Sequence, residues 1–100
     1  MVEMMSAEAF ERELDSVTQP ISLSDFINQH VRRYFNNCRL YCFFSNNSLR
    51  HIAISSIDSE FNHKLCNVWP MNPIKFSDYD DDSNDGFTIR VYDDGSYRIE

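Results

Sequence analysis

The sequence predicts an α+β domain in which two N-terminal helices pack on a mainly antiparallel sheet of about five strands, arranged as two hairpins plus a short strand. Apolar residues recur at helical spacing as far as residue 36. From residue 38 onward the spacing changes to the alternation that is typical of strands. One hundred residues are also a usual length for one domain, so we expect a single domain over residues 1–100.

The first helix is predicted over residues 6–17. Phe10, Leu14 and Val17 fall on one face of such a helix, and charged residues occupy most of the remaining circumference. Pro20 ends the segment, because proline disfavours a helical conformation in the residue before it.

A second helix is predicted over residues 22–36. Its first residues, Ser-Leu-Ser-Asp, resemble a capping box with aspartate in the acidic place. The apolar stripe along this helix is wide and consists of Leu23, Ile27, Val31, Tyr34 and Phe35.

A hairpin is predicted over residues 38–57, around Asn46-Asn47-Ser48. A three-residue loop would pair Cys42 with Ile52, whereas a two-residue loop would pair Cys42 with His51. The first register gathers the apolar side chains on one face, and a slip of one residue would expose them all. We therefore expect the three-residue loop.

That register places Tyr41, Phe43 and Ala53 on the opposite face of the sheet. Either the helices cover these side chains, which we favour, or they form an exposed aromatic patch of the kind that marks protein interfaces.

The remaining segments are a short strand over residues 64–69, an acidic loop over residues 77–86 and a second hairpin over residues 87–99. In this second hairpin we expect a three-residue loop, with Gly95 in the left-handed conformation that such a loop needs.

The same register makes Arg90 face Arg98 on the outer surface of the second hairpin. Like charges directly opposite each other are unfavourable, so we expect an acidic group nearby, from this chain or from a partner.

The formal net charge of −7 argues against direct binding to nucleic acid or to an anionic membrane, because both require a basic surface. The natural counterpart is a basic protein; the oligomeric state is left open. No window has the 18 or more apolar residues of a membrane span, and the N-terminal segment is too acidic for a secretory signal. An odd number of cysteines favours a reducing compartment, so we expect a cytoplasmic protein.

Two metal sites can be tested against the ligand spacing. Cys38-x3-Cys42 followed by His63-x2-Cys66 supplies four zinc ligands, but the spacing is loose and the first two cysteines are expected in the core. The acidic run places carboxylates at alternate positions, as in a calcium loop, but Ser83 and Ile89 stand where glycine and glutamate are required. We expect no metal and no cofactor.

No catalytic motif is present. Cys42 and His51 lie on neighbouring strands, but the preferred register places them on opposite faces of the sheet. Two glycines in the whole chain are too few for a phosphate-binding loop or a dinucleotide fingerprint. We expect no enzymatic activity and no catalytic residues.

Carboxylates interleaved with tyrosines are the strongest candidates for a binding site. Such a surface can imitate the phosphates and bases of nucleic acid and can steer a basic partner. The predicted partner-binding residues are Asp78, Tyr79, Asp80, Asp81, Asp82, Asp85, Tyr92, Asp93 and Asp94. The alternative is that these acidic loops only keep a small domain soluble.

In size and charge the chain resembles two groups of small acidic inhibitors. One consists of immunity proteins that neutralise nuclease toxins. The other consists of phage-encoded anti-defence proteins, including anti-CRISPRs and DNA mimics. The resemblance includes no motif. It implies a non-enzymatic inhibitor that binds the basic, nucleic-acid-binding surface of a partner protein.

Two other functions remain open. One is a small metal-dependent or hydrolytic enzyme that uses Cys42, His51 or His63. The other is an assembly subunit that binds through the aromatic face of the sheet.

Overall fold

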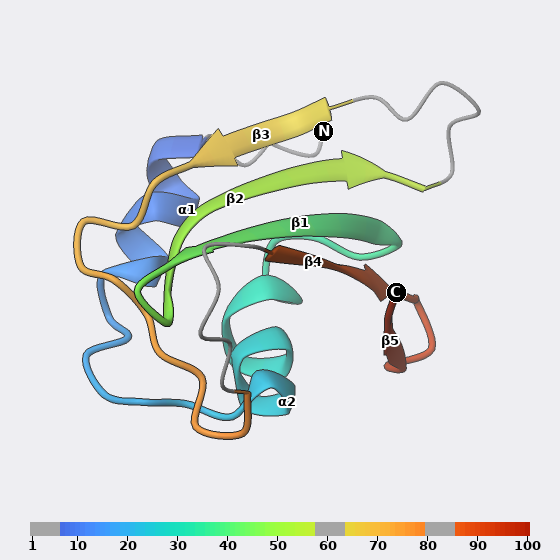
Figure 1. Ribbon diagram of the computed structural model, residues 1–100. Helices are drawn as coiled ribbons and strands as arrows, with labels where there is room; N and C mark the ends of the chain where they lie inside the picture. The colour runs from blue at the N-terminus through green and yellow to red at the C-terminus, as the bar shows by residue number, and fades with distance from the viewer. Residues whose placement is uncertain (1–6, 58–63, 80–85) are drawn as a thin grey trace.

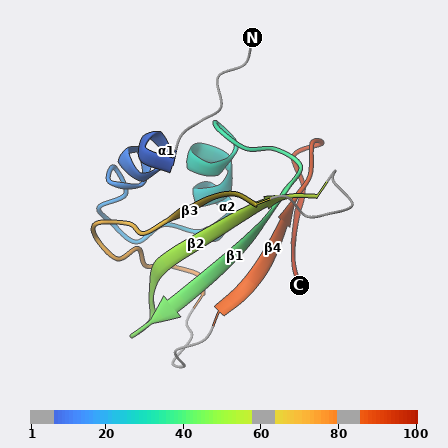
Figure 2. The same ribbon diagram turned by 90° about the horizontal axis from the view of Figure 1, so that it is seen from above.

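The computed structural model describes residues 7–57, 64–79 and 86–100. Its elements are α1 (Ala7–Leu14), α2 (Leu23–Phe26), the π-helical turn η1 (Ile27–Val31), β1 (Cys38–Ser45), β2 (Ser48–Ser56), β3 (Lys64–Val68), β4 (Gly86–Val91) and β5 (Tyr97–Ile99). The strands form one antiparallel sheet in the order β3-β2-β1-β4-β5, and both helices lie on the same side of it (Figures 1 and 2). The predicted α+β class with a five-stranded antiparallel sheet is confirmed. Within the described ranges, no helix combines the length and the apolar composition needed to cross a bilayer.

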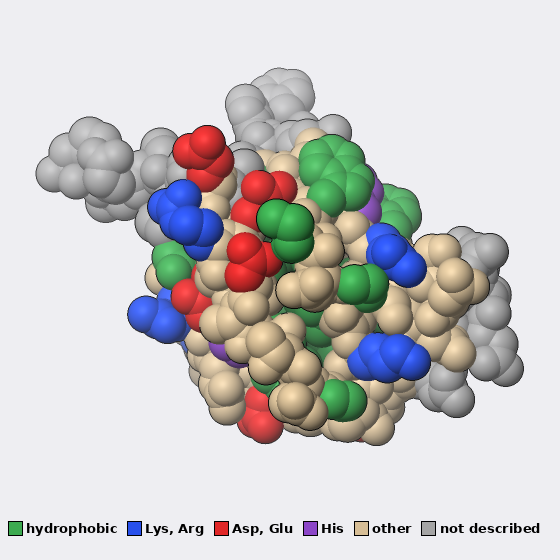
Figure 3. All heavy atoms as spheres, turned by 90° about the vertical axis from the view of Figure 1, so that its left-hand side faces the viewer, with side chains coloured by type: hydrophobic (Ala, Val, Ile, Leu, Met, Phe, Trp, Pro, Cys, Tyr) green, Lys and Arg blue, Asp and Glu red, His purple; other side chains and the backbone are tan. Residues whose placement is uncertain are grey.

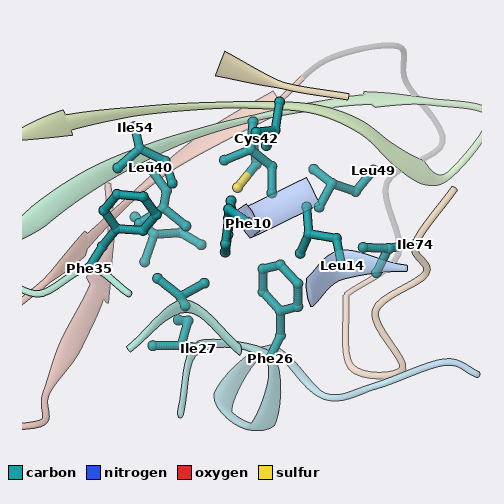
Figure 4. Close-up of a cluster of buried hydrophobic side chains, with 14 of the residues drawn as sticks. Phe10, Leu14, Phe26, Ile27, Phe35, Leu40, Cys42, Leu49, Ile54 and Ile74 are labelled. Carbon is teal, nitrogen blue, oxygen red and sulfur yellow. The ribbon is translucent and has the colours of Figure 1, made fainter. Parts of the chain in front are cut away.

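The hydrophobic core lies between the helices and one face of the sheet. Phe10 of α1 and Phe26 of α2 are fully buried, in one cluster with Leu40 and Cys42 of β1 and Ile54 of β2 (Figure 4). Because side chains alternate between the two faces of a strand, these sheet residues all point toward the helices.

Helix α1 was predicted over residues 6–17; residue 6 lies outside the described residues, and the end of the helix differs from the prediction. The regular helix ends at Leu14, and the chain then tightens into turns in which Ser16 N donates to Glu13 O and Val17 N donates to Leu14 O. Phe10, Leu14 and Val17 are buried as the helical spacing predicted.

The second predicted helix begins where expected but is neither regular nor as long. Ser22 caps it by accepting a hydrogen bond from Asp25 N, and only residues 23–26 are α-helical. The chain then widens into η1, where Arg32 N donates to Ile27 O, five residues back. Irregular turns replace the predicted helical residues up to 36, and Asn37 takes a positive φ of 51°.

The first hairpin has the predicted register but a different turn. Cys42 pairs with Ile52, as expected, yet the loop has two residues, Asn46 and Asn47, both with positive φ (55° and 63°). These angles suit the tight turn that matches the twist of a hairpin. Arg50 is skipped in the pairing as a bulge between the two strands, so a two-residue turn plus one extra residue has the same effect on register as a three-residue loop.

The second hairpin agrees with its prediction throughout. Val91 pairs with Tyr97, Arg90 pairs with Arg98, and Gly95 has a φ of 96°. The acidic partner required by the two arginines is Glu100, which forms ion pairs with Arg90, with Arg98 at 3.5 Å and with Arg39 at 3.9 Å. This cluster occupies the outer face of the sheet at its β4–β5 side.

Candidate interaction surface

The structure separates the predicted partner-binding residues into two groups. Asp78 and Tyr79 precede β4, whereas Tyr92, Asp93 and Asp94 follow it, so the two groups lie at opposite ends of this strand. Asp80, Asp81, Asp82 and Asp85 lie outside the described residues. The described members of the set therefore do not form one cluster, because a strand of six residues separates them by roughly 15–20 Å.

Asp78 and Tyr79 both have contacts within the fold. Asp78 Oδ1 accepts a hydrogen bond at 3.0 Å from the backbone amide of Leu23, one of the amides that the first turn of a helix leaves without an intrahelical acceptor. The Tyr79 ring packs on Phe87, with 4.4 Å between ring centroids, and on Phe44. A partner would therefore compete with internal contacts for these two side chains.

The residues after β4 form the turn of the second hairpin. Hydrogen bonds from the Ser96 hydroxyl and backbone amide to Asp94 lower the pKa of this carboxyl. Arg32 donates to the Tyr92 carbonyl at 3.0 Å and so connects this turn to the helical layer. Asp93 is exposed.

The cysteines lie in the interior and are free thiols. Burial raises the pKa of Cys38 and Cys42 to about 12 and that of Cys66 to about 11. Because the thiolate is the nucleophile and the metal ligand, these thiols are unreactive at neutral pH.

The candidate zinc and catalytic residues are not brought together in the part of the chain that the structure describes. There, no three side chains of His, Cys, Asp or Glu are grouped closely enough to hold a metal ion. Cys42 points into the core, whereas its suggested partner His51 lies on the other face of the sheet, paired with Phe43. His63 lies outside the described residues.

A polar cluster that the sequence did not predict joins α1 to η1. Glu13 accepts hydrogen bonds from Tyr34 at 2.9 Å and from Arg33 at 3.4 Å, and it lies 2.6 Å from His30 Nδ1. Burial acts to raise the pKa of Glu13, but the contacts with His30, Tyr34 and Arg33 outweigh it and lower this pKa. The hydrogen bond to Glu13 raises the pKa of Tyr34. The cluster holds two helical segments together.

The outer face of the sheet carries an exposed row of aromatic side chains. We call Phe43, His51 and Trp69 the aromatic row; they come from β1, from β2 and from the residue after β3. The rings of Phe43 and His51 stack with centroids 4.9 Å apart, and those of His51 and Trp69 stack almost parallel at 4.3 Å. Phe43 is 46% exposed and Trp69 is 58% exposed. The expectation that the helices cover Phe43 is therefore wrong, because both helices lie on the Leu40 side.

The other two residues of the predicted aromatic face are less accessible. Tyr41 is half-buried, and Ala53 is buried because its small side chain lies between the larger ones of Tyr41 and Asn67, its partners on the adjacent strands. Asn67 also fixes the row, since its Oδ1 lies 3.0 Å from His51 Nε2 and a carbonyl oxygen accepts the proton of that nitrogen.

An acidic groove borders the aromatic row. It has a volume of about 280 Å³ and is lined by Glu8, Glu11, Arg12, Asp15, Trp69 and Met71. Figure 3 shows this side of the molecule, with acidic side chains gathered over α1 next to hydrophobic side chains and a histidine. Glu11 Oε2 accepts a hydrogen bond from Trp69 N at 3.2 Å, so α1 and the end of β3 are directly connected at this groove.

Two further hollows have linings less suited to recognition. One of about 310 Å³ lies beside the first hairpin, and Lys75 is the charged residue in its lining. The other, of about 210 Å³, is wide open and is lined mainly by residues 16–21, with His30 at its side. Neither brings an exposed aromatic ring next to charged groups.

Part of the aromatic row can be predicted from the sequence. The apolar pattern places Phe43 opposite His51, and the structure confirms this pair. The sequence does not predict that Trp69 joins this row. Its place depends on the pairing of β3 with β2, and no turn signal between these strands predicts that pairing.

No family model, no curated protein and no solved structure matches this chain.

Proposed function

We propose that this chain is a small, acidic, non-enzymatic binding protein of the cytoplasm that docks on a basic surface of another protein. The aromatic row and the acidic groove form the centre of its interface. The basic surface is one that binds nucleic acid, so that docking inhibits the partner by competition.

The observation that carries the proposal is the aromatic row on an uncovered sheet face. A small domain gains stability by burying large aromatic side chains, yet Phe43 and Trp69 remain exposed, one stacked on each side of His51. Aromatic residues that are exposed and held in place are enriched at protein interfaces, where they supply large contact area at low entropic cost.

Charge determines the kind of partner. The chain carries −7 overall, and the groove beside Trp69 has three carboxylates against one guanidinium. A basic protein surface complements both, and charge complementarity raises the association rate and excludes acidic partners.

The acidic run at residues 78–85 contributes to this proposal as a source of charge. Exchange of Asp80, Asp81 and Asp82 for Asn should slow association at low salt and change dissociation little, because the net charge of the chain acts mainly on encounter.

The first test measures which proteins the immobilised chain captures from lysates. The lysates come from the cells that naturally contain the chain and from their natural competitors. Wild type should retain a basic protein at about 50 mM salt and lose it at about 500 mM, where screening is strong. Phe43→Thr should weaken this binding at least about fivefold, as truncation of an aromatic anchor typically does. Ile99→Thr is the matched control, because Ile99 is also 46% exposed but lies on the edge strand β5.

The second test measures inhibition. The captured partner is purified and bound to a labelled oligonucleotide; wild type should displace the oligonucleotide, and Phe43→Thr should do so only at higher concentration. Equal capture by Phe43→Thr and wild type, or a partner whose nucleic-acid binding is unaffected, would contradict the proposal.

A further inference from the structure

We infer that the acidic groove is a binding site for one arginine side chain of the partner, with its guanidinium stacked on the face of the Trp69 ring opposite His51. This inference rests on the proposed function and names the chemical group that its interface recognises.

Trp69 is stacked on one side and is still largely exposed. His51 covers one ring face in a stack that is within 3° of parallel, and the whole residue is still 58% exposed. Among the described residues no second ring stacks on Trp69, so the opposite face is the one on which we place the ligand. Since Trp69 also lines the groove, an incoming side chain can lie on an indole ring, the aromatic surface that attracts cations best.

The ring is also fixed before any ligand arrives. Glu11 accepts a hydrogen bond from the Trp69 backbone amide, and His51, which supports the ring, is itself held by Asn67. A site that is already ordered loses little conformational entropy on binding, so even a single side chain can bind measurably.

The rim of the groove selects a cation. Glu8 of α1 and Asp15, the residue directly after α1, are exposed carboxylates that line the same groove as Trp69. Together with Glu11 they give three negative charges against one positive charge from Arg12, a net charge of −2. Arg12 lies in the same lining, and its positive charge opposes an incoming cation.

Arginine fits these features better than lysine. A planar guanidinium stacks on an aromatic face while the N–H groups at its edge donate to carboxylates, whereas an ammonium is a strongly hydrated point charge. The volume of about 280 Å³ is slightly below that of typical small-molecule pockets, which are about 300–1,000 Å³, and it suits one side chain.

The experiment uses the full chain and the tripeptide acetyl-Gly-Arg-Gly-amide. Trp69 is the sole tryptophan of the chain, so its fluorescence and the NMR signal of its indole N–H report on this groove alone. The arginine peptide should change both signals saturably. The lysine peptide should bind several-fold more weakly, and the peptide with citrulline, which has the shape of arginine without its charge, should not saturate.

Variants test the role of charge in both directions. Arg12→Gln should raise the affinity for the arginine peptide about two- to fivefold, and Asp15→Asn should lower this affinity by a similar factor. This is the range expected for exposed charge pairs. Asp25→Asn removes the same charge on α2, outside the lining of the groove, and should leave the affinity unchanged. Trp69→Leu, followed through the backbone amide of Met71, should abolish binding.

The failures of the two proposals can be told apart. Equal responses to the arginine and citrulline peptides, or weaker binding by Arg12→Gln, would overturn the arginine site. If Phe43→Thr still lowers salt-sensitive capture in that case, the proposed function stands. Conversely, the Trp69 signal could respond to arginine while capture by Phe43→Thr is unchanged. This result would support the arginine site and contradict the proposed function.

Discussion

Glu13 connects α1 to the segment that includes η1 through polar contacts with three side chains. Its carboxylate is 10% exposed and bonds to side chains that lie 17 to 21 residues further along the chain, in and after η1. Such a group is stabilising only while it is charged and its partners are in place, because a buried polar group without a partner is costly.

Replacement of Glu13 by Ala should destabilise the protein by about 1–3 kcal/mol, since Tyr34 and His30 lose their shared acceptor. The free energy of unfolding in urea measures this, with Glu8→Ala as an exposed control on the same helix that should change it little.

The same carboxylate predicts a dependence on pH. Its pKa is lower in the folded protein than its ordinary value of 4.5, so its contribution is fully present above that pH and is lost as pH falls through the folded pKa. The difference in unfolding free energy between wild type and Glu13→Gln should therefore shrink below about pH 4.5. A difference that grows on acidification would show that the carboxylate is not stabilised by its partners.

At the scale of elements, the two hairpins show how register is determined. The apolar faces of β1 and β2 require Cys42 opposite Ile52, and the chain satisfies this with a tight Asn-Asn turn plus a bulge at Arg50. The loop length was mispredicted although the pairing was correct, because burial of one face fixes the register while several turn geometries are compatible with it.

The two glycines predict different costs for the same substitution. A Cβ at Gly86 would lie 2.0 Å from the Cys42 carbonyl oxygen, so β4 would have to move away from β1. At Gly95 the nearest atom is 3.8 Å away, and the cost comes only from the positive φ of 96°. We expect Gly86→Ala to cost about 3 kcal/mol and Gly95→Ala about 1 kcal/mol.

Thermal unfolding of the two variants measures this difference, and hydrogen exchange of the β1 and β4 amides locates it. Increased exchange should be confined to the β1–β4 pairing in Gly86→Ala and to the β4–β5 turn in Gly95→Ala. Equal loss of stability in the two variants would mean that β4 adjusts to the added carbon without losing its pairing.

On the scale of the whole molecule, the helices cover one face of the sheet, and no described helix covers the other. The helices bury the Leu40 face, whereas the outer face has the aromatic row near β3 and the three arginines with Glu100 near β5. Single-layer coverage leaves large side chains exposed, and net charge then keeps copies of the molecule apart.

We therefore expect self-association near the pI of about 4.7, where the net charge vanishes. Light scattering should show it for wild type and for Ile99→Thr, and much less for Phe43→Thr, while circular dichroism confirms that all three remain folded. Identical scattering by the two variants would show that the aromatic row does not drive association.

The sequence by itself determined the class of the fold, the register of both hairpins and the burial of residues such as Phe10, Leu14 and Cys42. These follow from the period of the apolar pattern, which depends only on neighbours in the chain and on the need to bury one face.

Tertiary structure alone decided which face of the sheet the helices cover, that Glu100 forms ion pairs with three arginines, and that Trp69 joins Phe43 and His51. It also separated Asp78 from Asp94 at opposite ends of β4. Each of these contacts joins residues of different elements, and their geometry is set by how layers pack. Local periodicity contains no information about that packing, so the strongest surface candidate became visible only in three dimensions.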